Sequence, residues 1–234
     1  MLHSLSTSGR LQTLGSSGRL AGRARGLFSA FAATSAAHLG SLLTGSSAAE
    51  QVTKPALMPL LAAHAVATEG PTPSLLTPAL AASTAGDVLL QFDSEPAFLA
   101  GMASFAAAHV CYIAMFAKQG AMTERRRLAI VAAGYALAWA VLLNRLWPGL
   151  GSLKVPVAGY SLLLASTAVT STGLGLRAGL GGGLFLLSDT LIATRLAGWK
   201  QLPGHEFWIM ATYLLAQYLL ATAALRAQTQ RSDA

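Results

Sequence analysis

The chain has 234 residues, of which 53% are hydrophobic and only 11% are charged. A soluble domain carries about 25% charged residues, so this composition excludes an ordinary soluble protein and predicts an all-α integral membrane bundle. The net charge of +7 does not indicate nucleic-acid binding, because the Lys and Arg residues lie between apolar segments rather than on one face.

The N-terminal segment, residues 1–26, is rich in Ser and Gly and contains four arginines but no acidic residue. This composition is typical of a basic cytoplasmic tail and also of an organellar transit peptide. We favour the tail. A cleaved secretory signal fits less well, because the apolar run from Leu27 resembles the first of many spans.

Eight apolar segments follow, separated by breaks that contain Pro, Gly or charged residues. They cover residues 27–46, 55–68, 74–91, 96–117, 127–147, 154–173, 177–197 and 205–226. Because a membrane-spanning helix needs about 20 apolar residues, the pattern predicts about eight transmembrane helices in a membrane domain of residues 27–226. A short polar tail, residues 227–234, ends the chain.

The basic residues divide unequally between the two sides of the predicted bundle. With eight spans, eleven Lys and Arg residues fall on the side of the N-terminus and five on the other side. The positive-inside rule then predicts that both termini are cytosolic. The host membrane is expected to be the endoplasmic reticulum or a bacterial inner membrane, or an organellar membrane if residues 1–26 are a transit peptide.

An internal repeat is suggested by three pairs of residues at spacings of 101 or 102. They are Pro55 and Pro156, Asp87 and Asp189, and Tyr112 and Tyr213. Each proline is expected to open a span. The spacing predicts two four-helix halves related by a parallel repeat, in which the two aspartates face each other across a pseudo-two-fold axis. Coincidence in an Ala- and Leu-rich chain is the alternative.

The two aspartates are the most informative residues. An ionisable side chain in a membrane span is costly, and it usually faces a bundle interior or watery cavity and marks function. Asp87 is expected near the outer end of the third span and Asp189 deeper in the seventh. Helix capping or helix pairing is the alternative for each.

A second group of polar residues lies in or beside the predicted spans and could serve the same site. Its members are Lys54, His109, Tyr112, Tyr160, Tyr213 and Gln217. The tyrosines could instead be interfacial anchors, and His109 could simply join two helices. The sequence contains no His/Cys cluster at metal-binding spacing, no nucleotide-binding loop and no nucleophile elbow.

Taken in order, these residues resemble the YhhN-like lysoplasmalogenase family between about residues 50 and 225. The matching pieces are Lys54-Pro55, Gly86-Asp87-Val88-Leu89-Leu90, Phe105 with His109 and Tyr112, Val155-Pro156 with Tyr160, Leu184 to Asp189, and Thr212-Tyr213 with Gln217. The resemblance implies an eight-span enzyme that hydrolyses the vinyl-ether bond of lysoplasmalogens. Its products would be a fatty aldehyde and a glycerophospho-alcohol, and its partners a lysophospholipid and the bilayer.

The chemistry of this reaction suits a pair of carboxyl groups. Protonation of the β-carbon of a vinyl ether gives an oxocarbenium ion that water attacks, so one protonated acid and one carboxylate are needed. We assign Asp189 as the acid and Asp87 as the base, an assignment that could be reversed. No cofactor is required.

The remaining residues would support this pair. Tyr213, Gln217, His109 and Tyr160 would orient the carboxyl groups or the water, and Lys54 would contact the lipid phosphate. The main alternative is a membrane transporter of a lipid or small molecule in which the aspartates relay protons. A structural protein with inert polar pairs is the third possibility.

Overall fold

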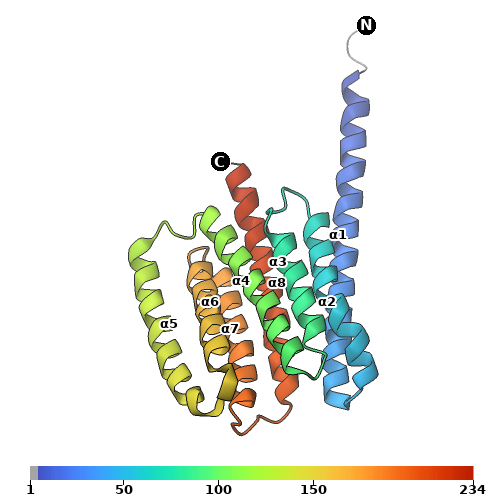
Figure 1. Cartoon of the computed structure of the whole chain (residues 1–234). Helices are drawn as coiled ribbons and strands as arrows, with labels where there is room; N and C mark the ends of the chain where they lie inside the picture. The colour runs from blue at the N-terminus through green and yellow to red at the C-terminus, as the bar shows by residue number, and fades with distance from the viewer. Residues whose placement is uncertain (1–4, 234) are drawn as a thin grey trace.

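The computed structural model describes residues 5–233, with side chains from residue 20 onward, and this part of the chain is a bundle of eight α-helices (Figure 1). The helices are α1 (Leu5–Thr44), α2 (Ser47–Ala67), α3 (Leu76–Leu89), α4 (Glu95–Lys118), α5 (Arg125–Leu146), α6 (Lys154–Thr172), α7 (Leu176–Leu196) and α8 (His205–Ser232). Two short 3₁₀ turns, η1 (Trp147–Gly149) and η2 (Gly151–Leu153), join α5 to α6. The predicted all-α fold is confirmed.

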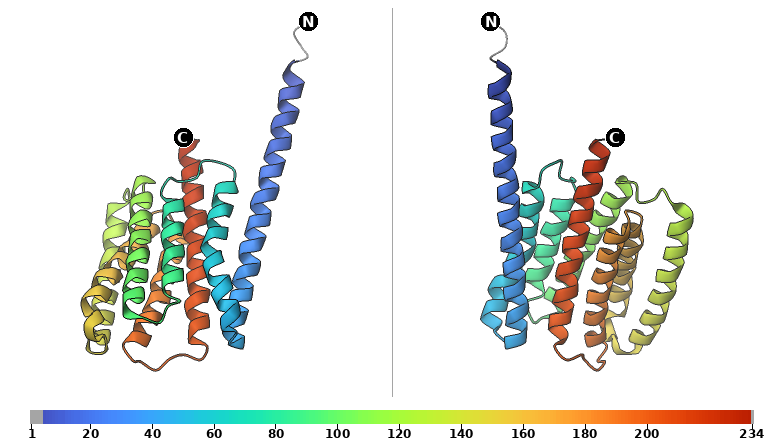
Figure 2. Two further views of the ribbon diagram at one scale, coloured as in Figure 1. Left: turned by 45° about the vertical axis from the view of Figure 1, so that its right-hand side comes forward. Right: turned by 180° about the vertical axis from the view of Figure 1, so that it is seen from behind.

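Successive helices run in opposite directions, so the bundle has two distinct ends. One end holds both termini and the α2–α3, α4–α5 and α6–α7 connections (Figure 1). The opposite end holds the α1–α2, α3–α4, α5–α6 and α7–α8 connections, and we call it the loop end. α8 lies between α7 on one side and α1 and α2 on the other, while α5 lies at the edge and packs mainly on α6 (Figure 2).

Six of the described helices are long and apolar enough to cross a membrane: α1 from Leu20, α4, α5, α6, α7 and α8. The chain is therefore a multi-pass membrane protein. The count is lower than the eight spans expected from sequence. α3 has only 14 residues, and α2 carries Glu50 and Lys54 within its first turns. Both nevertheless pack inside the bundle, where Leu57, Leu61 and Leu80 are fully buried.

Most helix boundaries agree with the predicted segments, and the clearest exception is α2. It begins at Ser47, so Pro55 lies inside the helix and does not open a span as expected. A proline removes one backbone donor and strains the preceding turn, but α2 extends through it because buried apolar residues such as Leu57 and Met58 follow directly. Pro156 does lie in the first turn of α6.

The boundary expected at residue 26 lies within α1, which runs without a break from Leu5 to Thr44. The division into a tail and a first span stays a prediction. Ala, Leu and Arg, which favour helix, are frequent between residues 19 and 28. Whether residues 1–26 are retained or cleaved stays a prediction.

The predicted parallel repeat agrees with the helix directions but not with the packing in detail. Corresponding helices of the two halves, such as α3 and α7, run the same way (Figure 1). α1, however, packs on α2 and α8, whereas its counterpart α5 packs mainly on α6. The two halves therefore have different surroundings.

Candidate active site

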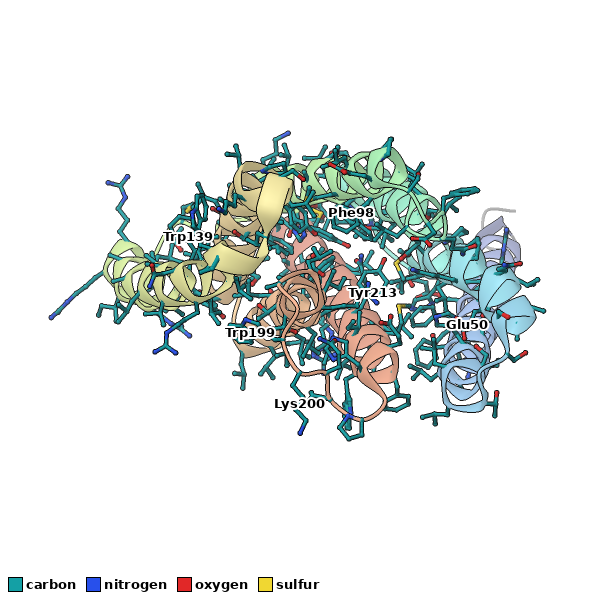
Figure 3. The ribbon with its side chains drawn as sticks, turned by 60° about the horizontal axis from the view of Figure 1, so that its bottom comes forward. Glu50, Phe98, Trp139, Trp199, Lys200 and Tyr213 are labelled. Carbon is teal, nitrogen blue, oxygen red and sulfur yellow. The ribbon has the colours of Figure 1, made fainter. Side chains whose placement is uncertain are left out.

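A cavity of about 440 Å³ opens at the loop end of the bundle. Its rim is formed by residues at the ends of five helices, namely Glu50, Gln91, Phe98, Arg195 and Glu206. Figure 3 looks at this end and labels four of the residues that line the cavity, Glu50, Phe98, Trp139 and Tyr213. The cavity is lined by both aspartates identified from the sequence, Asp87 and Asp189.

Asp87 lies on α3 and is almost completely buried, with 2% of its surface exposed. Its Oδ2 atom accepts a hydrogen bond of 2.7 Å from the hydroxyl of Tyr213 on α8. Tyr213 lines the same cavity. The predicted grouping of Asp87 with Tyr213 is therefore present, and it joins the two halves of the chain.

A second polar contact holds α3 against α8 one turn away. Gln217 lies four residues after Tyr213, and its amide donates to the Ser83 hydroxyl, which lies four residues before Asp87, at 3.0 Å. Tyr112 on α4 donates to the Gln217 Oε1 atom at 2.6 Å. Since residues four apart share a helix face, two matched pairs of side chains fix the register of Asp87. Tyr112 and Gln217 are fully buried and do not line the cavity.

Asp189 lies on α7 and is partly exposed, because the cavity reaches it. Its Oδ2 atom accepts a hydrogen bond from the hydroxyl of Tyr160 on α6. Each aspartate thus has one tyrosine donor on Oδ2. Within the described residues, neither Oδ1 atom accepts a hydrogen bond, and neither is among the buried polar atoms that lack a partner. Both Oδ1 atoms are therefore open to the cavity.

The two aspartates lie at different depths, as expected. Asp87 is two residues from the end of α3 and Asp189 is seven residues from the end of α7. Asp87 is nevertheless the more buried of the two, because the end of the short helix α3 is covered by Phe105 and Tyr213. The two carboxyl groups are close enough to interact electrostatically. Lys54, on the α2 wall of the cavity, is close enough to act on Asp87.

An aromatic cluster packs beneath the two carboxyl groups. The rings of Phe105, Phe185 and Tyr213 meet edge to face, with centroids 5.5 to 6.3 Å apart. His109 packs against Phe185 at 4.6 Å, and its Nδ1 atom lies 3.0 Å from the Thr167 hydroxyl. His109 does not line the cavity, so it contacts the cluster rather than the open space of the site.

Several cavity residues were missed by the sequence analysis. His38 on α1 is 1% exposed, and its Nδ1 atom lies 2.8 Å from the Thr53 hydroxyl, which in turn donates to a backbone carbonyl. The sequence feature that could have identified His38 is its position as a lone histidine in an apolar segment. Arg195, Glu206 and Trp139 also line the cavity. The first two lie at predicted helix ends, where charged residues are ordinary.

Gly86, next to Asp87, is required for the close packing of this cluster. A Cβ atom at Gly86 would lie 2.5 Å from the ring of Phe105, which Phe185 and Tyr213 hold in place. We expect Gly86→Ala to lower the free energy of unfolding by about 1–3 kcal/mol, as overpacked cores do. Thermal unfolding in detergent measures this loss.

The matched control for that substitution is Gly134 on α5, where a Cβ atom would meet nothing within 4 Å. Alanine favours helix over glycine by about 0.5–1 kcal/mol. Gly134→Ala is therefore expected to be neutral or stabilising. Equal unfolding temperatures for the two variants would contradict the packing proposed for Phe105.

Comparison with known proteins places this chain in a family. The model of the YhhN family matches residues 49–224. Lysoplasmalogenase TMEM86B of Homo sapiens is 35% identical over 159 residues, which cover 68% of this chain and 67% of the relative. The rat protein of the same name is 34% identical over 174 residues, covering 74% and 71%.

A bacterial relative is similar over a shorter stretch. Lysoplasmalogenase of Mycobacterium tuberculosis is 37% identical over 139 residues, which cover 56% of this chain and 52% of the relative. No solved structure matches the chain. The family match extends over α2 to α8, the helices that carry both aspartates and both tyrosine partners. The chain belongs to the YhhN family.

Proposed function

We propose that the protein is a membrane hydrolase that cleaves the vinyl-ether bond of lysoplasmalogens, releasing a fatty aldehyde and a glycerophospho-alcohol. The relatives named lysoplasmalogenase support this activity. The observation that carries it is the pair of carboxyl groups, Asp87 and Asp189, each with one oxygen open to the same cavity.

The two carboxyl groups have different roles in the reaction. Asp189 transfers a proton from Oδ1 to the β-carbon of the vinyl ether, and the double bond becomes an oxocarbenium ion. Asp87 stabilises this cation and accepts a proton from the water that attacks it. In the hemiacetal that forms, Asp87 returns its proton to the glycerol oxygen as the bond from carbon to that oxygen breaks. Asp189 takes the proton of the hemiacetal hydroxyl, which becomes the carbonyl of the aldehyde, and both carboxyl groups regain their starting forms.

The assignment of acid and base rests on the nearby charges. The ammonium group of Lys54 acts on Asp87 and favours its carboxylate form. Two neighbouring carboxyl groups resist double ionisation and share a proton. Within the described residues, Asp189 has no comparable cation near it, since its charged neighbour is Asp87 itself, so we place the shared proton on Asp189.

The neighbouring polar residues position this pair. Tyr160 and Tyr213 each occupy Oδ2 of one aspartate, which directs the remaining oxygen toward the substrate. Gln217, Tyr112 and Ser83 hold α3 in register with α8. His109 contacts Phe185 and Thr167 rather than the open space of the cavity, so it is a positioning residue.

The lining of the cavity suits a lysophospholipid. On the α5 side it presents Trp139, Leu142 and Leu143, which would contact the hydrocarbon chain. Near the rim it presents Lys54, which would contact the phosphate. The bilayer is the source of the substrate. We also propose that both termini are cytosolic, in the endoplasmic reticulum or a bacterial inner membrane, so the cavity would open on the non-cytosolic side.

The purified protein is expected to release aldehyde from a lysoplasmalogen and not from the matching 1-alkyl lysophospholipid, which lacks the double bond. In D₂O, the aldehyde should carry one deuterium on the carbon next to the carbonyl, because the solvent-exchanged acid delivers its proton there. Mass spectrometry of the trapped aldehyde measures both the amount released from each lipid and its deuterium content. Uptake of lipid without aldehyde release would favour the transporter and overturn the hydrolase.

A further inference from the structure

The rim of the cavity carries an ion pair that stability alone does not explain. The Arg195 guanidinium, in the last turn of α7, donates to the carboxylate of Glu206, in the first turn of α8. The side chains are 46% and 50% exposed, and ion pairs this exposed contribute little to folding. Both residues line the cavity.

The opposite wall of the rim carries a second set of charges. Glu50 and Lys54 lie four residues apart on one face of α2, and both line the cavity. Both are half-buried, and within the described residues neither forms an ion pair. The rim therefore presents two cations and two anions to a ligand that enters the cavity.

The charged rim lies at a suitable distance from the proposed catalytic pair. Arg195 follows Asp189 by six residues on α7, which corresponds to a rise of about 9 Å along the helix. In a lysoplasmalogen, seven covalent bonds separate the β-carbon that Asp189 protonates from the phosphorus, a reach of about 9 Å when extended. A lipid with its vinyl ether at Asp189 thus places its phosphate at the level of Arg195.

We propose that Arg195, Lys54 and Glu206 form a headgroup subsite for a zwitterionic phosphodiester, an inference that rests on the proposed function. Arg195 and Lys54 bind the phosphate from opposite walls, and Glu206 binds the ammonium group of the headgroup. The guanidinium contacts Glu206 through Nη1, which leaves further donors for a phosphate oxygen. The ion pair opens toward the lipid, and each charge gains an opposite partner.

The mixture of charges is the basis for choosing a zwitterion. An anionic headgroup would meet the phosphate-binding cations but would be repelled by Glu206 and Glu50. A neutral glycerol ether would supply no phosphate for Arg195 and Lys54. A phosphate followed by an ammonium group matches both signs of charge on the rim.

Binding of non-cleavable lipids tests the subsite separately from catalysis. The ligands are the saturated 1-alkyl forms of lysophosphoethanolamine, of glycerol 3-phosphate and of glycerol itself, measured as Kd with the full chain in detergent micelles. We expect Arg195→Gln to raise the Kd of the two phosphate-containing lipids about tenfold or more. Glu206→Gln should raise the Kd of the phosphoethanolamine lipid alone. Neither should change binding of the 1-alkylglycerol.

The matched control is Lys200, a cation at the same end of the bundle that does not line the cavity. Figure 3 shows its side chain pointing away from the bundle. Lys200→Gln should leave all three Kd values unchanged. Equal effects of Arg195→Gln on all three lipids, or no effect of Glu206→Gln on the zwitterion, would overturn the subsite. Failure to release aldehyde from the cleavable lipid would overturn the hydrolase and leave these binding results to decide the subsite.

Discussion

Replacing Asp189 with asparagine is expected to lower kcat for aldehyde release by a factor of about 10²–10⁴, the range that general acid catalysis contributes. Asparagine has nearly the shape of aspartic acid and can still accept from Tyr160, but it has no acidic proton to give to the β-carbon. The Kd for a 1-alkyl lysophospholipid should change little, because the carboxyl group lies at the reacting carbon rather than at the headgroup.

Two further measurements separate this role from a structural one. Tyr160→Phe removes the hydroxyl that orients Asp189 and retains the acid, so kcat should fall by a smaller factor, about tenfold. The unfolding temperature of Asp189→Asn should equal or exceed that of the wild type, since an ionisable group in the bundle is costly. A variant with full kcat, or one that only loses stability, would eliminate Asp189 as the acid.

The helices themselves could be predicted because their boundaries depend on local sequence. Ser94 caps α4 by accepting from the Ala97 amide, and Pro96 lies in its first turn. Gly175 and Gly204 adopt positive φ angles just before α7 and α8, which glycine tolerates and other residues resist. α2 was misjudged because Pro55 suggested a start, whereas the burial of the residues that follow it outweighs the local cost of proline.

The partners of the two aspartates could not be predicted from the repeat. By symmetry, Asp87 and Asp189 would have equivalent partners, but one accepts from α8 and the other from α6. The position equivalent to Tyr160, counted back by the repeat spacing of 101, is Pro59, which has no hydroxyl to donate. Such contacts depend on which helices pack side by side, and hydropathy does not contain that information.

Shared helix faces were a partial guide to the site. Tyr213 and Gln217 are four residues apart, and both contact α3. His109 and Tyr112 are three residues apart, but Tyr112 donates to α8 while His109 contacts α6. Residues three apart on a helix differ by about 60° around the axis, which is enough to face different neighbours in a tightly packed bundle.

Replacing Asp87 with glycine is expected to reduce aldehyde release by about 10²–10⁴, and sodium formate should restore part of it. The substitution removes the base and leaves space in the cavity where formate, itself a carboxylate, can accept the proton from water. Tyr213 and Lys54 remain to bind the added anion. Sodium chloride at the same ionic strength controls for screening, and the initial rate of aldehyde release is the measurement.

Asp189→Gly is the matched comparison and should not be rescued. Near neutral pH formate is almost entirely ionised, so it cannot supply the proton that the β-carbon needs. Rescue of Asp87→Gly alone assigns Asp87 as the base and Asp189 as the acid, in agreement with the electrostatic influence of Lys54 on Asp87. Rescue of Asp189→Gly alone would reverse the two roles. Rescue of neither, with both variants folded and binding lipid, would mean that the carboxyl groups do not act as an acid–base pair.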